Sequence, residues 1–184
     1  MVKELKAVIL GDYNVGKTTI LRKIMNLPIY NVQTTIGLDI QKYEHQDLSI
    51  NFWDTSGQEK FSAISKNYIK NSSLVLLVFD INRYETFMRI KDYWYNECKK
   101  NLSDENTFYF IIGNKMDLFR EHPIHRYNIN NNDNQKVYFI SATNDNLDKL
   151  LLDIYRISLE IENKPNAGTI VLNDILSKKN KCCN

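Results

Sequence analysis

Apolar residues gather in four short, almost unbroken segments of the chain: residues 6–10, 74–79, 107–112 and 137–140. Strands without alternation are buried on both faces, as in a parallel sheet covered by helices. In contrast, apolar and polar residues alternate through residues 38–41 and 48–52, which predicts two antiparallel strands at a sheet edge. The predicted sheet is therefore mixed.

The segments between these strands have the three-to-four-residue apolar spacing that is typical of helices. This spacing occurs at residues 20–25, 87–94 and 147–161. Strands that alternate with helices predict an α/β, doubly wound fold, whose ligands bind at the carboxyl ends of the strands. We expect a mostly parallel six-stranded sheet with one antiparallel edge strand and helices on both faces.

Two stretches lack either periodicity. Residues 126–134 are rich in Asn and predict a surface loop. From residue 164 onward the chain is polar and contains Pro165 and Gly168, which predicts a flexible tail. We therefore expect a single domain over residues 1–163 followed by a C-terminal tail over residues 164–184.

The composition narrows the class of protein. Hydrophobic residues at 43% and charged residues at 25% of 184 residues are typical of a globular chain. A net charge of +2 gives no reason to expect a nucleic-acid partner. Three cysteines do not form a disulfide framework, and neither a membrane span nor a signal peptide is apparent, so we expect a cytosolic protein.

A phosphate-binding motif follows the first predicted strand. Residues 11–18 (GDYNVGKT) match GxxxxGKT, with a strand before the motif and a helix after it. Backbone N–H groups of such a loop surround phosphate oxygens, while Lys17 reaches the β and γ phosphates and the Thr18 hydroxyl binds Mg²⁺. The sequence therefore predicts a P-loop NTPase fold.

A second motif, residues 113–117 (GNKMD), follows the third apolar strand. The carboxylate of Asp117 can accept from both N1–H and the 2-amino group of guanine, a donor pair that adenine lacks. A site built to hydrogen-bond its substrate discriminates by about 10⁴-fold or more. We therefore expect GTP and GDP as the nucleotides.

Two further segments carry groups suited to phosphate chemistry. Within residues 52–59 (FWDTSGQE), Asp54 can hold Mg²⁺ through water, Gly57 can donate its N–H to the γ-phosphate and Gln58 can orient the attacking water. Residues 34–39, called here the switch I loop, offer a hydroxyl for Mg²⁺. Both segments would be ordered by the γ-phosphate and released by its loss.

Over nearly its whole length the sequence resembles the Ras superfamily of small GTPases, and within it the Rab family. Residues 36–40 (IGLDI) are similar to the Rab motif IGVDF, residues 52–59 to WDTAGQE, and residues 68–70 (YIK) to YYR. The resemblance implies that Thr35 is a magnesium ligand, that Gln58 orients the attacking water, and that residues 141–143 contact guanine. The predicted catalytic residues are Lys17 and Gln58, and the predicted magnesium ligands are Thr18, Thr35 and Asp54. The predicted nucleotide-binding residues are Asn14, Val15, Gly16, Lys17, Thr18, Thr19, Thr35, Gly57, Asn114, Lys115, Asp117, Ser141, Ala142 and Thr143.

The resemblance also implies a function. Such a protein alternates between GDP and GTP states, hydrolyses GTP and recruits effector proteins in vesicle and membrane trafficking. Its partners would include an exchange factor and an activating protein, which act on the switch regions.

Some residues depart from the family pattern. Tyr13 and Asn14 stand where relatives usually have small residues, and Ser56 replaces the Ala of DTAGQ. These departures predict a slow intrinsic hydrolysis rate and keep open an alternative, a module that holds GTP without useful turnover. A nucleotide kinase is disfavoured because no arginine-rich lid is present. Tyr30 is the candidate for stacking on guanine.

The chain ends in Cys182, Cys183 and Asn184, an ending similar to the double-cysteine ends of Rab proteins. The resemblance implies two geranylgeranyl groups on Cys182 and Cys183. Two lipid chains anchor a protein stably, and Lys178, Lys179 and Lys181 add attraction to anionic lipid. We therefore expect the protein on the cytoplasmic face of an intracellular membrane, with a soluble cytosolic pool.

Overall fold

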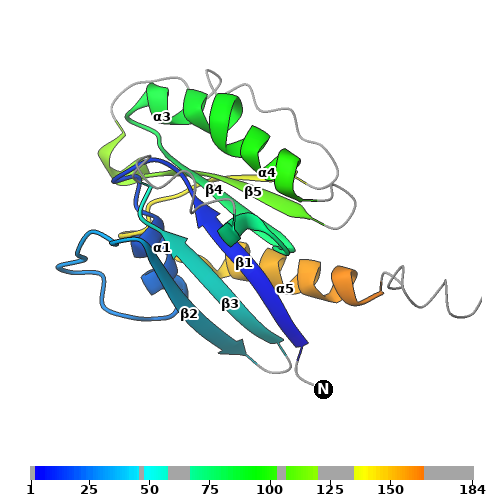
Figure 1. Cartoon of the computed structure of the whole chain (residues 1–184). Helices are drawn as coiled ribbons and strands as arrows, with labels where there is room; N and C mark the ends of the chain where they lie inside the picture. Colours follow the sequence, from blue (N-terminus) through cyan, green and yellow to red (C-terminus); the bar gives the residue numbers. More distant parts are fainter. Residues whose placement is uncertain (1–2, 46–47, 58–66, 103–106, 120–134, 164–184) are drawn as a thin grey trace, which may run out of the picture.

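A six-stranded sheet with strand order β2-β3-β1-β4-β5-β6 forms the centre of the computed structural model (Figure 1). The structure describes residues 3–45, 48–57, 67–102, 107–119 and 135–163. The strands are β1 (Lys3–Leu10), β2 (Leu38–His45), β3 (Leu48–Thr55), β4 (Leu74–Asp80), β5 (Phe108–Asn114) and β6 (Gln135–Phe139). Only β2 and β3 pair antiparallel among these neighbours, so the predicted fold class is confirmed.

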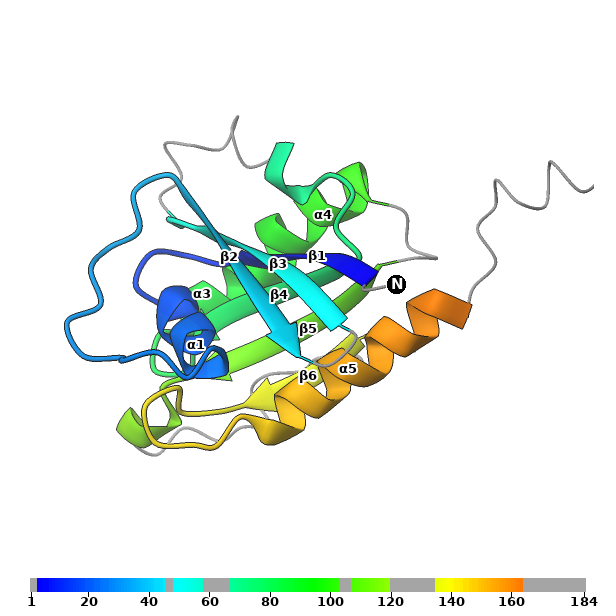
Figure 2. The same cartoon turned by 90° about the horizontal axis from the view of Figure 1, so that it is seen from below.

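Helices cover both faces of this sheet (Figures 1 and 2). One face carries α1 (Lys17–Ile24) and α5 (Asp148–Asn163), and the other carries α3 (Tyr84–Arg89), η2 (Ile90–Trp94) and α4 (Tyr95–Asn101). Alternate residues of β1 serve the two cores: Ala7 and Ile9 belong to the first, while Val8 and Leu10 belong to the second. Burial on both faces explains why this strand shows no polar alternation.

The helical segment predicted over residues 87–94 is longer and less regular than its spacing indicated. Helical structure continues from α3 through η2 to α4, and η2 is a π-helical turn. The wider turn adds a residue relative to an α-helix and is often found at functional sites. It ends at Trp94, whose side chain contacts the phosphate loop.

The carboxyl ends of the parallel strands lie along one edge of the sheet. β1 leads into the phosphate loop, β3 into Ser56, β4 ends at Asp80 and β5 ends at Asn114. A short 3₁₀ turn, η4 (Met116–Leu118), follows β5. This edge is where ligands bind in open α/β sheets. Every motif with predicted nucleotide chemistry that the structure describes therefore converges here.

Two predicted segments lie outside the described residues: the Asn-rich loop over residues 126–134 and the tail over residues 164–184. In the part of the chain that the structure covers, none of the helices has the length and apolar character needed to cross a bilayer.

Candidate nucleotide-binding site

The phosphate loop joins β1 to α1, and its glycine conformation is required by its surroundings. Gly16 has a φ of 95°, and a Cβ at this position would overlap the side-chain amide of Asn114. Lys17 is only 5% exposed, and its Nζ donates to the carbonyl oxygens of Gly11 and Asp12 at 2.9 Å. Burial lowers the pKa of Lys17 to about 8, an effect that the nearby carboxylates of Asp54 and Asp12 partly oppose. The ammonium group therefore lies in an enclosed site that favours an anionic ligand.

Gly57 lies against the same loop. Its φ is 71°, and an added Cβ would contact Lys17 Nζ and lie 2.6 Å from the Gly11 carbonyl oxygen. The main chain of Gly57 therefore approaches the phosphate loop more closely than any other residue type would allow. Its predicted role toward the γ-phosphate requires this proximity.

Three predicted magnesium ligands converge beside Lys17. Thr18 donates to Asp54 Oδ2 at 2.6 Å, Thr35 donates to the same oxygen at 3.2 Å, and the two hydroxyl oxygens lie 2.8 Å apart. Asp54 is fully buried, and its Oδ1 has no hydrogen-bond partner among the described residues. Burial raises the pKa of Asp54, although the hydrogen bond from Thr18 and the charge of Lys17 oppose the shift.

This donor set fits magnesium. Mg²⁺ is bound through oxygen, commonly by one or two carboxylates together with substrate phosphates and water. The buried, unpaired oxygen of Asp54 needs such a partner, since an unsatisfied buried carboxylate oxygen is costly. The described residues contain no cluster of three or more His, Cys, Asp or Glu side chains suited to a metal. The donors at this site are two hydroxyls and one carboxylate, a set suited to Mg²⁺ that is bound together with phosphate oxygens and water.

The predicted guanine-binding residues lie together at the ends of β5 and β6. Asn114 Nδ2 donates to the Val15 carbonyl at 2.9 Å, and the Ala142 N–H donates to Asn114 Oδ1 at 3.0 Å. Ser141 donates its hydroxyl to Asp117 Oδ1 at 2.6 Å, and its oxygen lies 2.9 Å from the hydroxyl of Thr143. Asn114 therefore joins the phosphate loop to the predicted guanine-binding loop through two buried hydrogen bonds.

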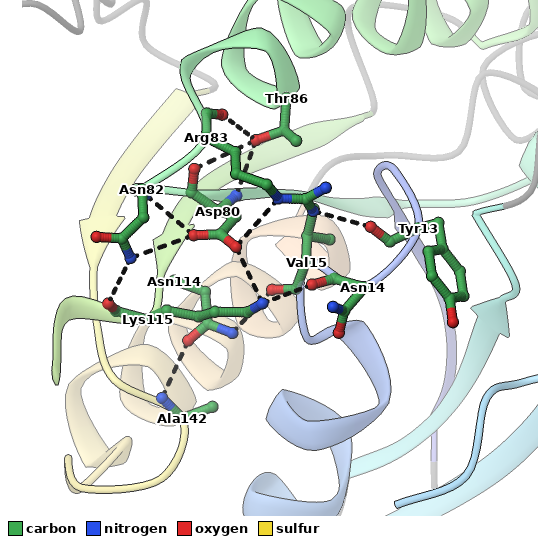
Figure 3. A network of polar contacts seen from close by, with 10 residues as sticks. All are labelled: Tyr13, Asn14, Val15, Asp80, Asn82, Arg83, Thr86, Asn114, Lys115 and Ala142. Carbon is green, nitrogen blue, oxygen red and sulfur yellow. Dashed lines mark hydrogen bonds and ion pairs between the residues drawn. The ribbon is translucent and has the colours of Figure 1, made fainter. Parts of the chain in front are cut away.

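Asp80 is the centre of a polar network beside this loop (Figure 3). Its Oδ2 accepts from Lys115 Nζ at 2.9 Å and Arg83 Nε at 3.3 Å, and its Oδ1 accepts from the backbone N–H of Asn82 at 2.9 Å. Burial alone would raise the pKa of Asp80, but hydrogen bonds and the charge of Lys115 hold it below its ordinary value. Asp80 is therefore held as a carboxylate.

The two cations held by Asp80 also bind the phosphate loop. Lys115 Nζ donates to the Asn14 carbonyl at 2.7 Å, and Arg83 Nη2 donates to the Tyr13 carbonyl at 2.9 Å. Asn14 has a φ of 59°, a left-handed conformation that favours glycine, and Asn tolerates it better than most residues. The network thus supports the part of the loop where this chain departs from the family pattern (Figure 3).

The side chain of Tyr13 lines the phosphate cavity together with residues of the switch I loop. Its hydroxyl oxygen lies 3.4 Å from that of Thr34, and the side chain is about half exposed. The phenol thus joins the phosphate loop to the switch I loop across the mouth of the cavity.

Asp12 connects the loop to the opposite helical layer. Its Oδ1 accepts from Arg89 Nε and from Trp94 Nε1, both at 2.9 Å. The π-helical turn η2 ends at Trp94. These contacts attach the phosphate loop to α3 and η2.

An exposed surface beside the phosphate cavity is formed by the switch I loop and the neighbouring edge of the sheet. Ile36 is 90% exposed and Ile40 is 52% exposed. On the adjacent strand, Trp53 lies under Lys6 Nζ, 3.9 Å from the ring centroid, and its ring is 5.9 Å from that of Tyr68. These side chains form an apolar and aromatic surface next to the phosphate cavity.

The structure brings nearly all the predicted nucleotide residues to one edge of the sheet. Three predicted functional residues, Gln58, Cys182 and Cys183, lie outside the described residues. Tyr30 is 74% exposed, and its predicted stacking on guanine stays a prediction. Sequence reasoning missed Asp80, Arg83, Arg89 and Trp94. The signal for Asp80 was a single carboxylate ending an otherwise apolar strand.

Comparisons with known proteins agree with this geometry. The profile of the Ras family matches residues 6–159. Rab-7B of Dictyostelium discoideum is 30% identical over 190 residues, which cover 99% of this chain and 95% of that protein. Two Arabidopsis thaliana proteins align over shorter regions: RABC2b is 30% identical over 61% of its length, and RABA5a is 36% identical over 52% of its length.

The chain therefore belongs to the Ras family of small GTPases. The relatives named above are Rab proteins, in agreement with the motifs in residues 36–40 and 52–59. Guanine nucleotide and Mg²⁺ are the ligands of this family in general, and hydrolysis of GTP is its general activity.

Proposed function

We propose that this protein is a Rab-like switch that binds GTP, hydrolyses it to GDP and recruits effector proteins to an intracellular membrane. The convergence of Thr18 and Thr35 on Asp54 carries the proposal. It links the phosphate loop, the switch I loop and the end of β3 through the groups that a bound triphosphate and its metal would engage. Loss of the γ-phosphate would remove the reason for Thr35 to stay there.

In the proposed reaction, water attacks the γ-phosphorus and the bond to the β–γ bridging oxygen breaks, which yields GDP and inorganic phosphate. Lys17 and the loop N–H groups bind the phosphate oxygens, where negative charge is redistributed. Gln58 orients the water. When bound by Thr18, Thr35 and Asp54, Mg²⁺ supplies neutralisation of the phosphate charge. Asp117 selects guanine.

The exposed surface formed by Ile36, Ile40 and Trp53 supports the effector role. Ile36 lies within the switch I loop and Ile40 directly follows it on β2, so γ-phosphate binding and effector binding would be coupled through one segment. Residues 1–163 act as the GTPase domain and residues 164–184 as the tail that carries lipid on Cys182 and Cys183. The similarity to Rab-7B supports a trafficking role at a membrane, with a cytosolic pool.

A GTP-binding module with little turnover is the second candidate. Tyr13 favours it because a phenol lines the phosphate cavity. The resemblance to small GTPases implies that the attacking water and the groups that act on it need this space. In that case the protein would stay in its GTP state and release effectors only on nucleotide exchange.

Single-turnover hydrolysis of γ-labelled GTP by the full chain tests both candidates. The proposed GTPase yields one equivalent of phosphate in a first-order reaction that Gln58→Leu slows by at least about tenfold. The matched variant Gln41→Leu, on β2, leaves the rate unchanged. Tight GTP binding without phosphate release over hours, alone or with activating proteins for Rab relatives, would favour the second candidate. Failure to bind GTP would contradict both.

A further inference from the structure

A groove with a volume of about 400 Å³ lies between α5 and the β2–β3 hairpin, apart from the nucleotide site. Its apolar lining comes from Tyr43, Leu48, Ile50, Leu151, Leu152 and Tyr155. Its polar members are His45 on β2 and Asp148 in the first turn of α5. Figure 2 shows α5 crossing beneath this hairpin.

The apolar surface continues along α5 beyond the groove. Leu152 is 49% exposed and Leu159 is 41% exposed. Tyr155 is partly exposed, and residues 152, 155 and 159 share one side of the helix because they are three and four residues apart. Single exposed leucines are ordinary, but an exposed apolar row that continues into a groove indicates a contact surface.

The chain itself supplies a segment of matching character. It continues past Asn163, the end of α5, and residues 169–176 read TIVLNDIL, with apolar side chains at 170–172 and 175–176. Pro165 and Gly168 precede this segment, and both residue types favour a reversal of chain direction. Asn163 is about 16 Å from Leu152 along the helix axis, at about 1.5 Å per residue. Residues 164–176 can span about 40 Å when extended, so the segment reaches the groove easily.

Charge favours the same arrangement. Lys178, Lys179 and Lys181 follow the apolar segment, whereas Asp148 is exposed at the far end of the groove-lining face of α5. A tail that runs back along α5 brings these lysines toward Asp148. The segment is covalently attached to α5 through residues 164–168. A short flexible linker of this kind gives the attached segment an effective concentration at the groove in the millimolar range. A contact too weak for a separate partner is therefore sufficient for this segment.

We propose that residues 169–176 fold back along α5 and pack their apolar side chains in the groove beside Leu152. The tail would then be a docked segment followed by a short free end, residues 177–184, rather than flexible throughout. Docking would hold Cys182 and Cys183 near the domain and shorten the reach of any group attached to them. This inference is independent of GTP hydrolysis.

Hydrogen exchange of the full-length, unlipidated chain tests the docking. The parent carries Cys182→Ser and Cys183→Ser. We expect amides in residues 169–176 to exchange at least about tenfold more slowly than in Leu152→Glu and Leu152→Lys variants of this parent. Both variants are needed, because release of the segment by only one of the two charges would indicate an electrostatic effect and would contradict an apolar contact at Leu152. Leu152 is half exposed, so both variants should keep the fold, which unchanged GTP affinity would verify.

A disulfide measurement tests the position independently. Two cysteine pairs are introduced separately into the same parent: Leu159→Cys with Leu172→Cys, and Glu160→Cys with Leu172→Cys. The equilibrium between thiols and disulfide in a glutathione buffer gives the effective concentration of each pair. Residues 159 and 160 lie equally far from the tail but on different sides of α5, and Cys98 is buried. We expect the first pair to have an effective concentration at least about tenfold higher. Equal effective concentrations for the two pairs, together with rapid amide exchange of residues 169–176 in the parent, would overturn the proposal. Amide protection that increases with protein concentration would also overturn it, because it would indicate docking onto a second copy of the chain.

Discussion

The ammonium group of Lys115 lies 2.9 Å from the carboxylate of Asp80, and both side chains are mostly buried. Lys115 also donates to the Asn14 carbonyl, so the pair links the guanine-binding motif to the phosphate loop. We predict that Asp80→Asn leaves the Lys115 and Arg83 cations without their shared anion and loosens that loop. GDP release should become at least about tenfold faster, a change of about 1.4 kcal/mol in affinity if association is unaffected.

Release of a fluorescent GDP analogue measures this effect. Asp92→Asn is the charge-matched control, because Asp92 is exposed on η2. Release rates for Asp80→Asn within twofold of the parent would contradict the role of this network.

We predict that nucleotide selectivity depends on Asp117. Replacement by Asn exchanges a hydrogen-bond acceptor for a donor, so Asp117→Asn should lose affinity for GTP and gain relative affinity for xanthosine triphosphate. Competition binding with GTP, XTP and ATP measures the change. Equal affinity of the unchanged protein for ATP and GTP would be incompatible with the predicted base selection.

We predict that Tyr13 affects the rate of hydrolysis. Its hydroxyl lies 3.4 Å from that of Thr34, and the ring lines the phosphate cavity. Tyr13→Gly should accelerate hydrolysis stimulated by an activating protein by at least about tenfold, or about 1.4 kcal/mol of barrier. Tyr13→Phe separates the ring from the hydroxyl and should stay slow if the ring is the obstacle. Rates for parent and Tyr13→Gly within a factor of two would show that Tyr13 has no part in turnover.

Another polar cluster joins α5 to β6, and we predict that it contributes to the stability of the fold. Asp153 on α5 accepts from Lys136 Nζ at 2.8 Å and from the Tyr138 hydroxyl at 2.7 Å, both on β6. Burial raises the pKa of Asp153, but these hydrogen bonds and the charges of Lys136 and Arg156 outweigh it, and the net pKa lies below the ordinary 3.8. A carboxyl group with a lowered pKa stabilises the fold above its unfolded pKa and loses this effect as the pH falls through its folded pKa.

We therefore predict that Asp153→Asn lowers the free energy of unfolding by about 1–3 kcal/mol at pH 7, because the hydrogen bonds to a charged acceptor are lost. The difference should shrink as the pH falls below about 3.8. Urea titrations of both proteins at pH 7 and pH 3 measure it. Glu160→Gln, at an exposed position of the same helix, is the control. A difference that is constant with pH would contradict the assignment.

Membrane attachment is predicted to depend on both terminal cysteines. Changing Cys182 or Cys183 alone to Ser should leave a weakly bound protein, since one lipid chain gives marginal binding, and changing both should release it. Cell fractionation and intact mass of the cellular protein measure binding and lipid. Persistence of the double variant on membranes would refute the assignment.

The sequence was sufficient to predict the sheet, and it also predicted a set of nucleotide-binding residues most of which the structure brings to one edge of that sheet. Leu74, Leu76 and Val78 face one core while Val75, Leu77 and Phe79 face the other, so an unbroken apolar run is what a doubly covered strand requires. The phosphate loop was recognisable because Gly16 and Lys17 are restricted by local backbone geometry and by phosphate binding. These constraints act within a few residues and therefore leave a readable local pattern.

Contacts between distant segments left no such pattern. Arg83 and the Tyr13 carbonyl are 70 residues apart, and Trp94 and Asp12 are 82 residues apart. Whether these pairs come into contact depends on how two helical layers pack on one sheet. The π-helical turn was also unpredictable, because residues 87, 90 and 94 fit an ordinary α-helix equally well.

The bond between Trp94 and Asp12 gives the protein an internal optical reporter. The chain has two tryptophans, and they lie in different surroundings: Trp94 bonded to the phosphate loop, and Trp53 beneath Lys6 and beside Tyr68. Indole emission responds to hydrogen bonding and to nearby charge. In a Trp94→Phe protein the remaining emission comes from Trp53, beside the switch I loop. In a Trp53→Phe protein it comes from Trp94, whose indole is bonded to Asp12 of the phosphate loop. Stopped-flow fluorescence of these two proteins can therefore measure changes at the switch I loop and changes at the phosphate loop separately, without an attached dye.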